Sequence, residues 1–112
     1  MTTVSIPEAG TFSLSTKQFT FSELVYRRGR LVGRDDAVCS WRAQFENIRC
    51  RITVSLPNGR LFLVLRLGPD PQGSFKVTRG TGVYAGKTGV GIYRNLTDTL
   101  SKVTIWLTSQ RS

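Results

Sequence analysis

Apolar and polar residues alternate with a period of two along most of this chain, and no segment keeps a 3.6-residue apolar period. Alternation of this kind indicates β-strands with one buried face. We predict eight short strands, over 4–6 or 11–15, then 19–28, 31–43, 47–56, 60–67, 74–79, 89–95 and 101–109. Gly, Pro and Asn residues at Arg28-Gly29, Pro57-Asn58-Gly59, Gly68-Pro69-Asp70-Pro71 and Gly80-Thr81-Gly82 supply turns, and a further turn is expected at Gln44-Phe45.

Short, regularly spaced strands without helices are typical of an all-β sandwich or barrel. We predict a single eight-stranded antiparallel closed barrel, because closure leaves no strand edge exposed. With 112 residues, we expect one β-barrel domain over 1–112.

The Asn58-Gly59 pair predicts a tight hairpin with Leu56 opposite Leu61, Val54 opposite Leu63 and Ile52 opposite Leu65 on a buried face. The other face carries Phe62 and Val64. A fully solvated face does not need these two residues, so we interpret them as part of a subunit interface.

Counting equal numbers of residues on each side of a hairpin centred between Gln44 and Phe45 places Cys39 opposite Cys50. Cross-strand neighbours form a disulfide only in a favourable geometry. Two buried thiols are the expected state in a cytosolic protein.

Composition removes several kinds of chemistry. The chain has no His, which excludes Ser-His-Asp and Cys-His catalysis and almost every zinc site. Asp35 and Asp36 are adjacent in a strand and point to opposite faces, so they form no catalytic dyad. No apolar run approaches the ~20 residues of a membrane span, and residues 1–10 do not resemble a signal peptide. We expect a cytoplasmic protein with no metal, cofactor or membrane partner.

The chain is strongly basic, with 16 Lys and Arg against 7 Asp and Glu and a formal charge of +9. Arg27, Arg28, Arg30 and Arg34 surround Gly29, and Arg49 and Arg51 lie on the expected outer face. A nucleic-acid binder interleaves basic and aromatic residues. Basic and aromatic residues do not cluster together along this sequence. A solvated basic surface is therefore favoured, and nucleic acid is an unlikely partner.

Glycine is concentrated in residues 80–91, which include Gly86-Lys87-Thr88. The stretch partly matches a Walker A loop and a dinucleotide fingerprint, but the residues after it predict a strand rather than the required helix. We favour a turn between two strands, where missing side chains allow close backbone approach.

Three stretches carry a family resemblance: Glu23 to Tyr26 followed by Gly29 and Leu31-Val32-Gly33; Ala37-Val38-Cys39; and Thr78 to Gly89. Together they resemble the allene oxide cyclase barrel superfamily, which includes plant cyclases, dirigent proteins and bacterial polyketide cyclases. The resemblance implies an eight-stranded barrel, a dimer or trimer, and an apolar cavity. It also implies that a reactive polyene or epoxide is held in one shape while it cyclises, with no cofactor.

The resemblance places Tyr93 where related cyclases have a pocket Trp, and Cys39 where plant cyclases have a pocket Cys. No position matches the glutamate and asparagine of the plant cyclases safely. We predict Tyr93 as the catalytic residue that orients a substrate carbonyl. The predicted ligand-binding residues are Tyr26, Cys39, Trp41, Leu63, Leu65 and Val77. If Tyr93 faces inward, then Val90 and Ile92 face outward, which requires a bulge or an apolar outer patch.

The favoured function is that of a cofactor-independent cyclase of bacterial polyketide biosynthesis, which folds a polyene for intramolecular cyclisation such as a [4+2] cycloaddition. One alternative is a non-catalytic or dirigent-like barrel that binds a small hydrophobic ligand. A second is a basic nucleic-acid-binding barrel.

Overall fold

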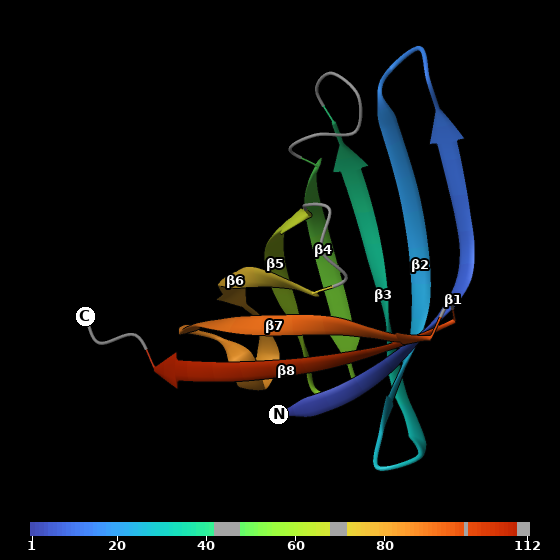
Figure 1. Cartoon of the computed structure of the whole chain (residues 1–112). Coiled ribbons are helices and arrows are strands. Elements are labelled where there is room, and N and C mark those ends of the chain that lie inside the picture. The colour runs from blue at the N-terminus through green and yellow to red at the C-terminus, as the bar shows by residue number, and fades with distance from the viewer. Residues whose placement is uncertain (42–47, 68–71, 98, 110–112) are drawn as a thin grey trace.

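The computed structural model describes residues 1–41, 48–67, 72–97 and 99–109, and these form a closed antiparallel barrel of eight strands in sequential order (Figure 1). The strands are β1 (Thr2–Ser13), β2 (Gln18–Arg27), β3 (Arg30–Ser40), β4 (Ile48–Leu56), β5 (Gly59–Leu67), β6 (Gln72–Gly80), β7 (Lys87–Thr97) and β8 (Leu100–Ser109). The predicted fold class is confirmed. No helix among these residues is both long enough and apolar enough to span a bilayer.

β1 explains why two short segments were expected at the start of the chain. It is one strand of 12 residues, and its register with β2 shifts between Pro7 and Ala9. Before the shift, Thr2–Ser5 pair with β8 and close the barrel. After it, β1 pairs with β2 alone, and this hairpin extends past the other strands (Figure 1). The bulge therefore lets one strand serve both the barrel wall and a projecting hairpin.

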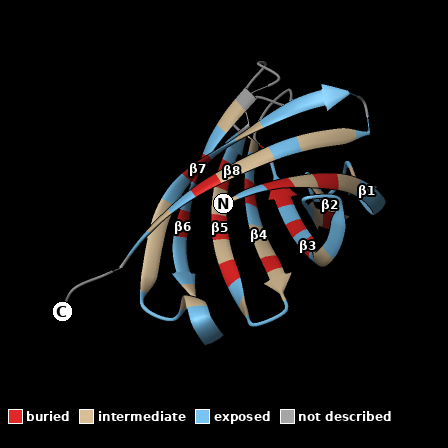
Figure 2. Cartoon of the chain, turned by 90° about the horizontal axis from the view of Figure 1, so that it is seen from below, coloured by how far each residue is buried: buried red, intermediate tan, exposed pale blue. Residues whose placement is uncertain are grey.

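The buried residues have one parity on each strand, so their side chains face the inside of the barrel. Figure 2 marks these residues along the strands. On β3, Ala37 and Cys39 are buried, and Trp41, which directly follows the strand with the same parity, is buried too. The remaining core residues come from neighbouring strands and include Val25, Val54, Leu61, Phe75, Val77 and Ile105.

The register of the β4–β5 hairpin differs from the prediction by two residues. The structure pairs Leu56 with Gly59 and Val54 with Leu61, so the turn is Pro57-Asn58. Gly59 is held in the strand by the loop after β6: the Arg60 N–H donates to Thr81 Oγ1 at 3.1 Å, and a Cβ on Gly59 would overlap the Thr81 carbonyl oxygen. Gly59 thus serves close packing instead of the turn.

The glycine-rich stretch is the predicted turn between two strands. It contains one 3₁₀ turn, Gly82–Tyr84, and Gly82 and Gly86 have positive φ. The Val83 N–H donates to the Asn58 carbonyl at 3.0 Å. The loop therefore folds against the β4–β5 turn, with no helix of the kind a phosphate site requires.

Cys39 lies opposite Cys50, as predicted, but the two residues form a disulfide. The expectation of two free thiols is wrong. The pairing places both side chains on the same inner face of neighbouring strands, directly opposite one another, so the two sulfur atoms can meet. The centre of the expected hairpin, Gln44-Phe45, lies outside the described residues.

Removing this disulfide is expected to lower the free energy of unfolding by about 3 kcal/mol, because it closes a loop of 11 residues' separation in the unfolded chain. The test is urea unfolding of Cys39→Ala/Cys50→Ala against the oxidised parent. Unfolding the parent in a thiol reductant is the control, and it should show the same loss. An unchanged unfolding midpoint would contradict the prediction.

Candidate active site

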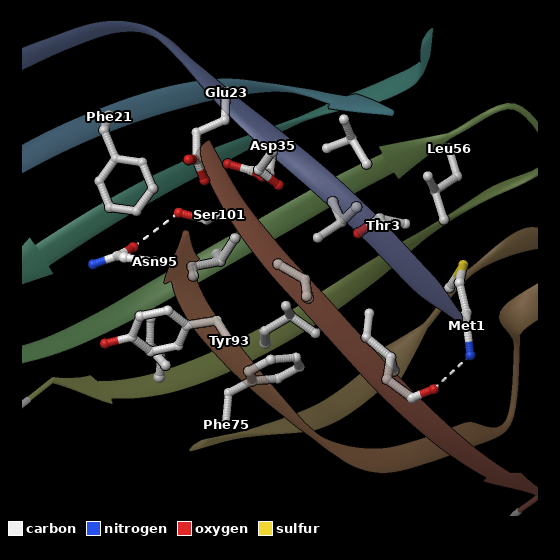
Figure 3. Close-up of a pocket in the computed structure, with 18 residues that line it drawn as sticks. Met1, Thr3, Phe21, Glu23, Asp35, Leu56, Phe75, Tyr93, Asn95 and Ser101 are labelled. Carbon is white, nitrogen blue, oxygen red and sulfur yellow. Dashed lines mark hydrogen bonds between the residues drawn. The ribbon is translucent and has the colours of Figure 1, made fainter. Parts of the chain in front are cut away.

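The barrel encloses a cavity of about 220 Å³ that is lined by inward-facing side chains from all eight strands (Figure 3). Most of the lining is apolar, with Phe21, Ile52, Leu63, Leu65, Val103 and Ile105 among its residues. A dry apolar cavity of about 150 Å³ is enough to hold benzene. This cavity therefore has room for a molecule of one or two rings.

Two glycines shape the wall by leaving space for aromatic rings. Gly91 on β7 lies opposite Phe75 on β6, and a Cβ on Gly91 would overlap the Phe75 ring. Gly73 stands in the same relation to Tyr93. Each ring therefore lies over a neighbouring glycine, which leaves the interior of the barrel less filled.

Glu23 and Asp35 are the acidic groups of the cavity. They are directly paired across β2 and β3, and their side chains lie beside one another (Figure 3). Asp35 is 5% exposed, and its Oδ2 accepts a hydrogen bond from the Ser5 hydroxyl at 3.5 Å. Its Oδ1 is buried without a hydrogen-bond partner among the described residues. The neighbouring carboxyl group of Glu23 is the available partner for this oxygen, and two carboxyl groups can form a hydrogen bond only when one of them is protonated.

The protonation of this pair is set by burial and by mutual repulsion. Burial, then the nearby charge of Glu23, raises the pKa of Asp35 to about 8. Burial also raises the pKa of Glu23, while a hydrogen bond from Asp35 opposes that rise. Asp35 is therefore protonated at neutral pH and can donate a hydrogen bond, while Glu23 is the partner that ionises first.

Further polar groups lie along β7 and β8. The Ser101 hydroxyl donates to Asn95 Oδ1 at 2.9 Å, and this pair is next to Phe21 and the carboxyl groups (Figure 3). Burial raises the pKa of the Tyr93 phenol, so this group stays a neutral donor. The cavity thus offers a few polar groups in an apolar wall, which is the usual composition of a small-molecule site.

The structure brings together three of the residues predicted for the site. Tyr93, Leu63 and Leu65 line the cavity. Val77 is buried in the core outside the cavity lining. Gly91 lies on the inner face with Tyr93, while Val90 and Ile92 are exposed, so the apolar outer patch exists.

The other three predicted residues lie away from the cavity. Cys39 is in the disulfide. Trp41 stacks on Phe12, with ring centroids 5.2 Å apart. Tyr26 borders a separate hollow beside the β2–β3 turn, because it directly follows inward-facing Val25 and therefore points to the outer side of the strand. None of these three lines the central cavity.

Sequence reasoning missed the carboxyl pair, although its parity was available. Asp35 has the same inward parity as Ala37, Cys39 and Trp41. Glu23 is two residues before buried Val25, so it lies on the same face of its strand. The adjacent acids Asp35 and Asp36 do point to opposite faces, as predicted. The partner of Asp35 is instead Glu23, 12 residues earlier on the neighbouring strand.

Comparisons with known proteins place the fold. No family model matches the sequence, and no curated protein matches it. Among solved structures, a pyocyanin demethylase matches with a TM-score of 0.75 and 18% identity, over 95% of this chain and 98% of that one. A pterocarpan synthase dirigent protein matches with a TM-score of 0.69 and 13% identity, over 85% and 73%. At these identities the likeness shows a shared fold.

Proposed function

We propose that this protein, which has the barrel fold of the allene oxide cyclase superfamily, is a cofactor-independent isomerase or cyclase. The fold alone does not determine an activity, so the residues of the cavity carry the proposal. The protein binds a small apolar molecule in the barrel, and Glu23 moves a proton from one carbon of that molecule to another while Asp35 donates a hydrogen bond to it. The observation that carries the proposal is the carboxyl pair in an apolar cavity, with Asp35 held protonated.

The two carboxyl groups have complementary roles. Protonated Asp35 donates a hydrogen bond to a substrate carbonyl oxygen and stabilises the negative charge that develops there. Ionised Glu23 removes a proton from the carbon next to that carbonyl and returns it to another carbon. Both groups end the cycle in their starting state, so the net reaction is an isomerisation and consumes no cofactor.

The cyclisation of a polyketide polyene, predicted from the sequence, is a finer version of this proposal. A hydrogen bond from Asp35, or from the predicted Tyr93, to the carbonyl of an unsaturated ketone makes its double bond more reactive in a [4+2] cycloaddition. The apolar wall holds the reacting ends together. The cavity volume supports a reacting unit of one or two rings.

The test uses cyclohex-3-enone as a probe and follows its conversion to conjugated cyclohex-2-enone by ultraviolet absorbance. We expect the protein to accelerate the conversion with saturation kinetics, and 2-naphthol, which fits a two-ring cavity, to compete. Binding of 2-naphthol without acceleration would reject catalysis and support the ligand-binding alternative. Absence of both binding and turnover would reject the cavity as the site.

A further inference from the structure

The acidic side chains that the structure describes are confined to one side of this barrel, whereas basic side chains occur on both sides. All acidic residues described by the structure lie on β1, β2 or β3: Glu8, Glu23, Asp35 and Asp36. The described outer face of β4 to β8 carries basic residues and no acidic one. Among the described residues there is a single ion pair, Arg34 with Glu8, and it is on the acidic side. The described residues of β4 to β8 therefore include no carboxylate that neutralises the basic side chains on these strands.

Register brings basic and apolar residues together on this outer face. Across β4 to β8, one row runs Arg51, Val64, Lys76, Val90, Trp106, and the next row begins Arg49, Arg66, Ser74, Ile92. These residues are far apart in the sequence, which is why sequence inspection found no common basic and aromatic cluster. We call the surface that they form the basic face.

The basic face is hollowed into a shallow groove. Its lining includes Arg49, Arg66, Lys76, Val90, Ile92 and Trp106. Trp106 is 54% exposed and Val90 is 55% exposed, so an aromatic plane and an aliphatic surface lie open to solvent between the cations. Beside the groove, the Arg79 guanidinium lies 4.4 Å from the centre of the Phe62 ring.

The placement of like charges favours an anionic occupant. Arg49 and Arg66 are directly paired across β4 and β5, an arrangement that destabilises a sheet unless a counter-charge relieves it. The described residues of this face supply no carboxylate. An anion with several charges along its length relieves the repulsion at each cation in turn.

We infer that the basic face is a binding site for single-stranded nucleic acid, separate from the cavity. Phosphates contact Arg49, Arg51, Arg66 and Lys76, and an unpaired base stacks on Trp106. A groove holds a single strand, whereas a flat anionic bilayer does not reach its floor. A duplex keeps its bases stacked on one another, so it has no free base for Trp106.

The first experiment measures binding of a fluorescein-labelled dT15 by anisotropy at several salt concentrations. Each neutralised phosphate contributes a slope of about −0.7 in log K against log salt for single strands. The four cations of the basic face therefore predict a slope of about −3 for the parent protein. The double variant Arg49→Gln/Arg66→Gln removes two of these cations and is expected to reduce the magnitude of the slope by about 1.4. The matched control is Arg27→Gln/Arg30→Gln, a second cross-strand arginine pair away from the groove, which is expected to leave the slope unchanged. If the salt slope fell equally in both double variants, the effect would come from net charge alone, and the proposed binding site would be overturned.

The second experiment tests the stacking. Trp106→Ala is expected to weaken dT15 binding roughly 5- to 100-fold with an unchanged salt slope, and Trp106→Phe to restore most of it. Because Trp41 is buried, acrylamide quenching reports mainly Trp106, and dT15 should protect it. Protection of Trp106 in the free protein, with a dimer or trimer mass, would show that a second copy covers the face and would overturn the proposal. Stronger binding to phosphatidylglycerol vesicles than to dT15 would also overturn it.

Discussion

Replacing Glu23 with glutamine is expected to slow cyclohex-3-enone isomerisation by about 10²- to 10⁴-fold, the usual contribution of a general base. Glutamine keeps the size of the side chain and cannot accept the proton. The binding of 2-naphthol should change little, since the apolar wall is intact. We therefore expect Glu23→Gln to lower kcat and to leave KM nearly unchanged.

The control for this variant is Asp36→Asn. Asp36 is next to Asp35 in the chain, and its side chain lies on the exposed face of β3. The control removes one carboxylate charge from the neighbouring strand, outside the cavity lining, and its turnover should equal that of the parent. Equal rates for Glu23→Gln and the parent would show that Glu23 is not the base.

The stability of the protein is expected to fall by several kcal/mol as the pH rises from about 4 to about 8, at about 1.4 kcal/mol for each unit of pKa shift. In the folded state burial, with the charge of Glu23, raises the pKa of Asp35 from 3.8 to about 8. Between these values the folded chain keeps a proton that the unfolded chain has released. Folding is then opposed increasingly as the pH rises, and the raised pKa of Glu23 acts in the same direction.

Urea unfolding across this pH range tests the effect. Asp35→Asn removes the ionisable group, so its unfolding free energy should depend on pH much less than that of the parent and exceed it at alkaline pH. Asp36→Asn should retain most of the slope of the parent, because the charge of Asp36 is a smaller cause of the raised pKa of Asp35 than burial or Glu23. An identical slope in Asp35→Asn and the parent would show that Asp35 ionises normally in the folded protein.

The cavity and the catalytic proposal depend on closure of the barrel. Closure requires that β1 reach β8, and the N-terminal ammonium donates to the Ile105 carbonyl at 2.8 Å where they meet. A closed wall removes water from the carboxyl pair, and this desolvation is the largest cause of the raised pKa of Asp35. The same fold that provides the ligand site therefore also tunes its acid.

Predictions from local pattern were accurate where they depended on alternation. The strands of the described region and the pairing of Cys39 with Cys50 follow from a period of two and from symmetric counting about a turn. The β4–β5 register failed because Gly59 was assigned to the turn from its dipeptide. Its contact with Thr81, over 20 residues away, decides its position.

The sequence by itself determined that this protein is an all-β barrel, that its inward positions alternate along each strand, and that histidine chemistry is excluded. These properties depend on side-chain period and residue type, which are local. Only the tertiary structure decided that Glu23 meets Asp35 in a mostly apolar cavity, that the cysteines are bonded, and that Trp106 lies among arginines from β4 and β5. Each of these depends on which strands become neighbours and in what register, because cross-strand contacts join residues whose separation along the chain carries no signal of their meeting.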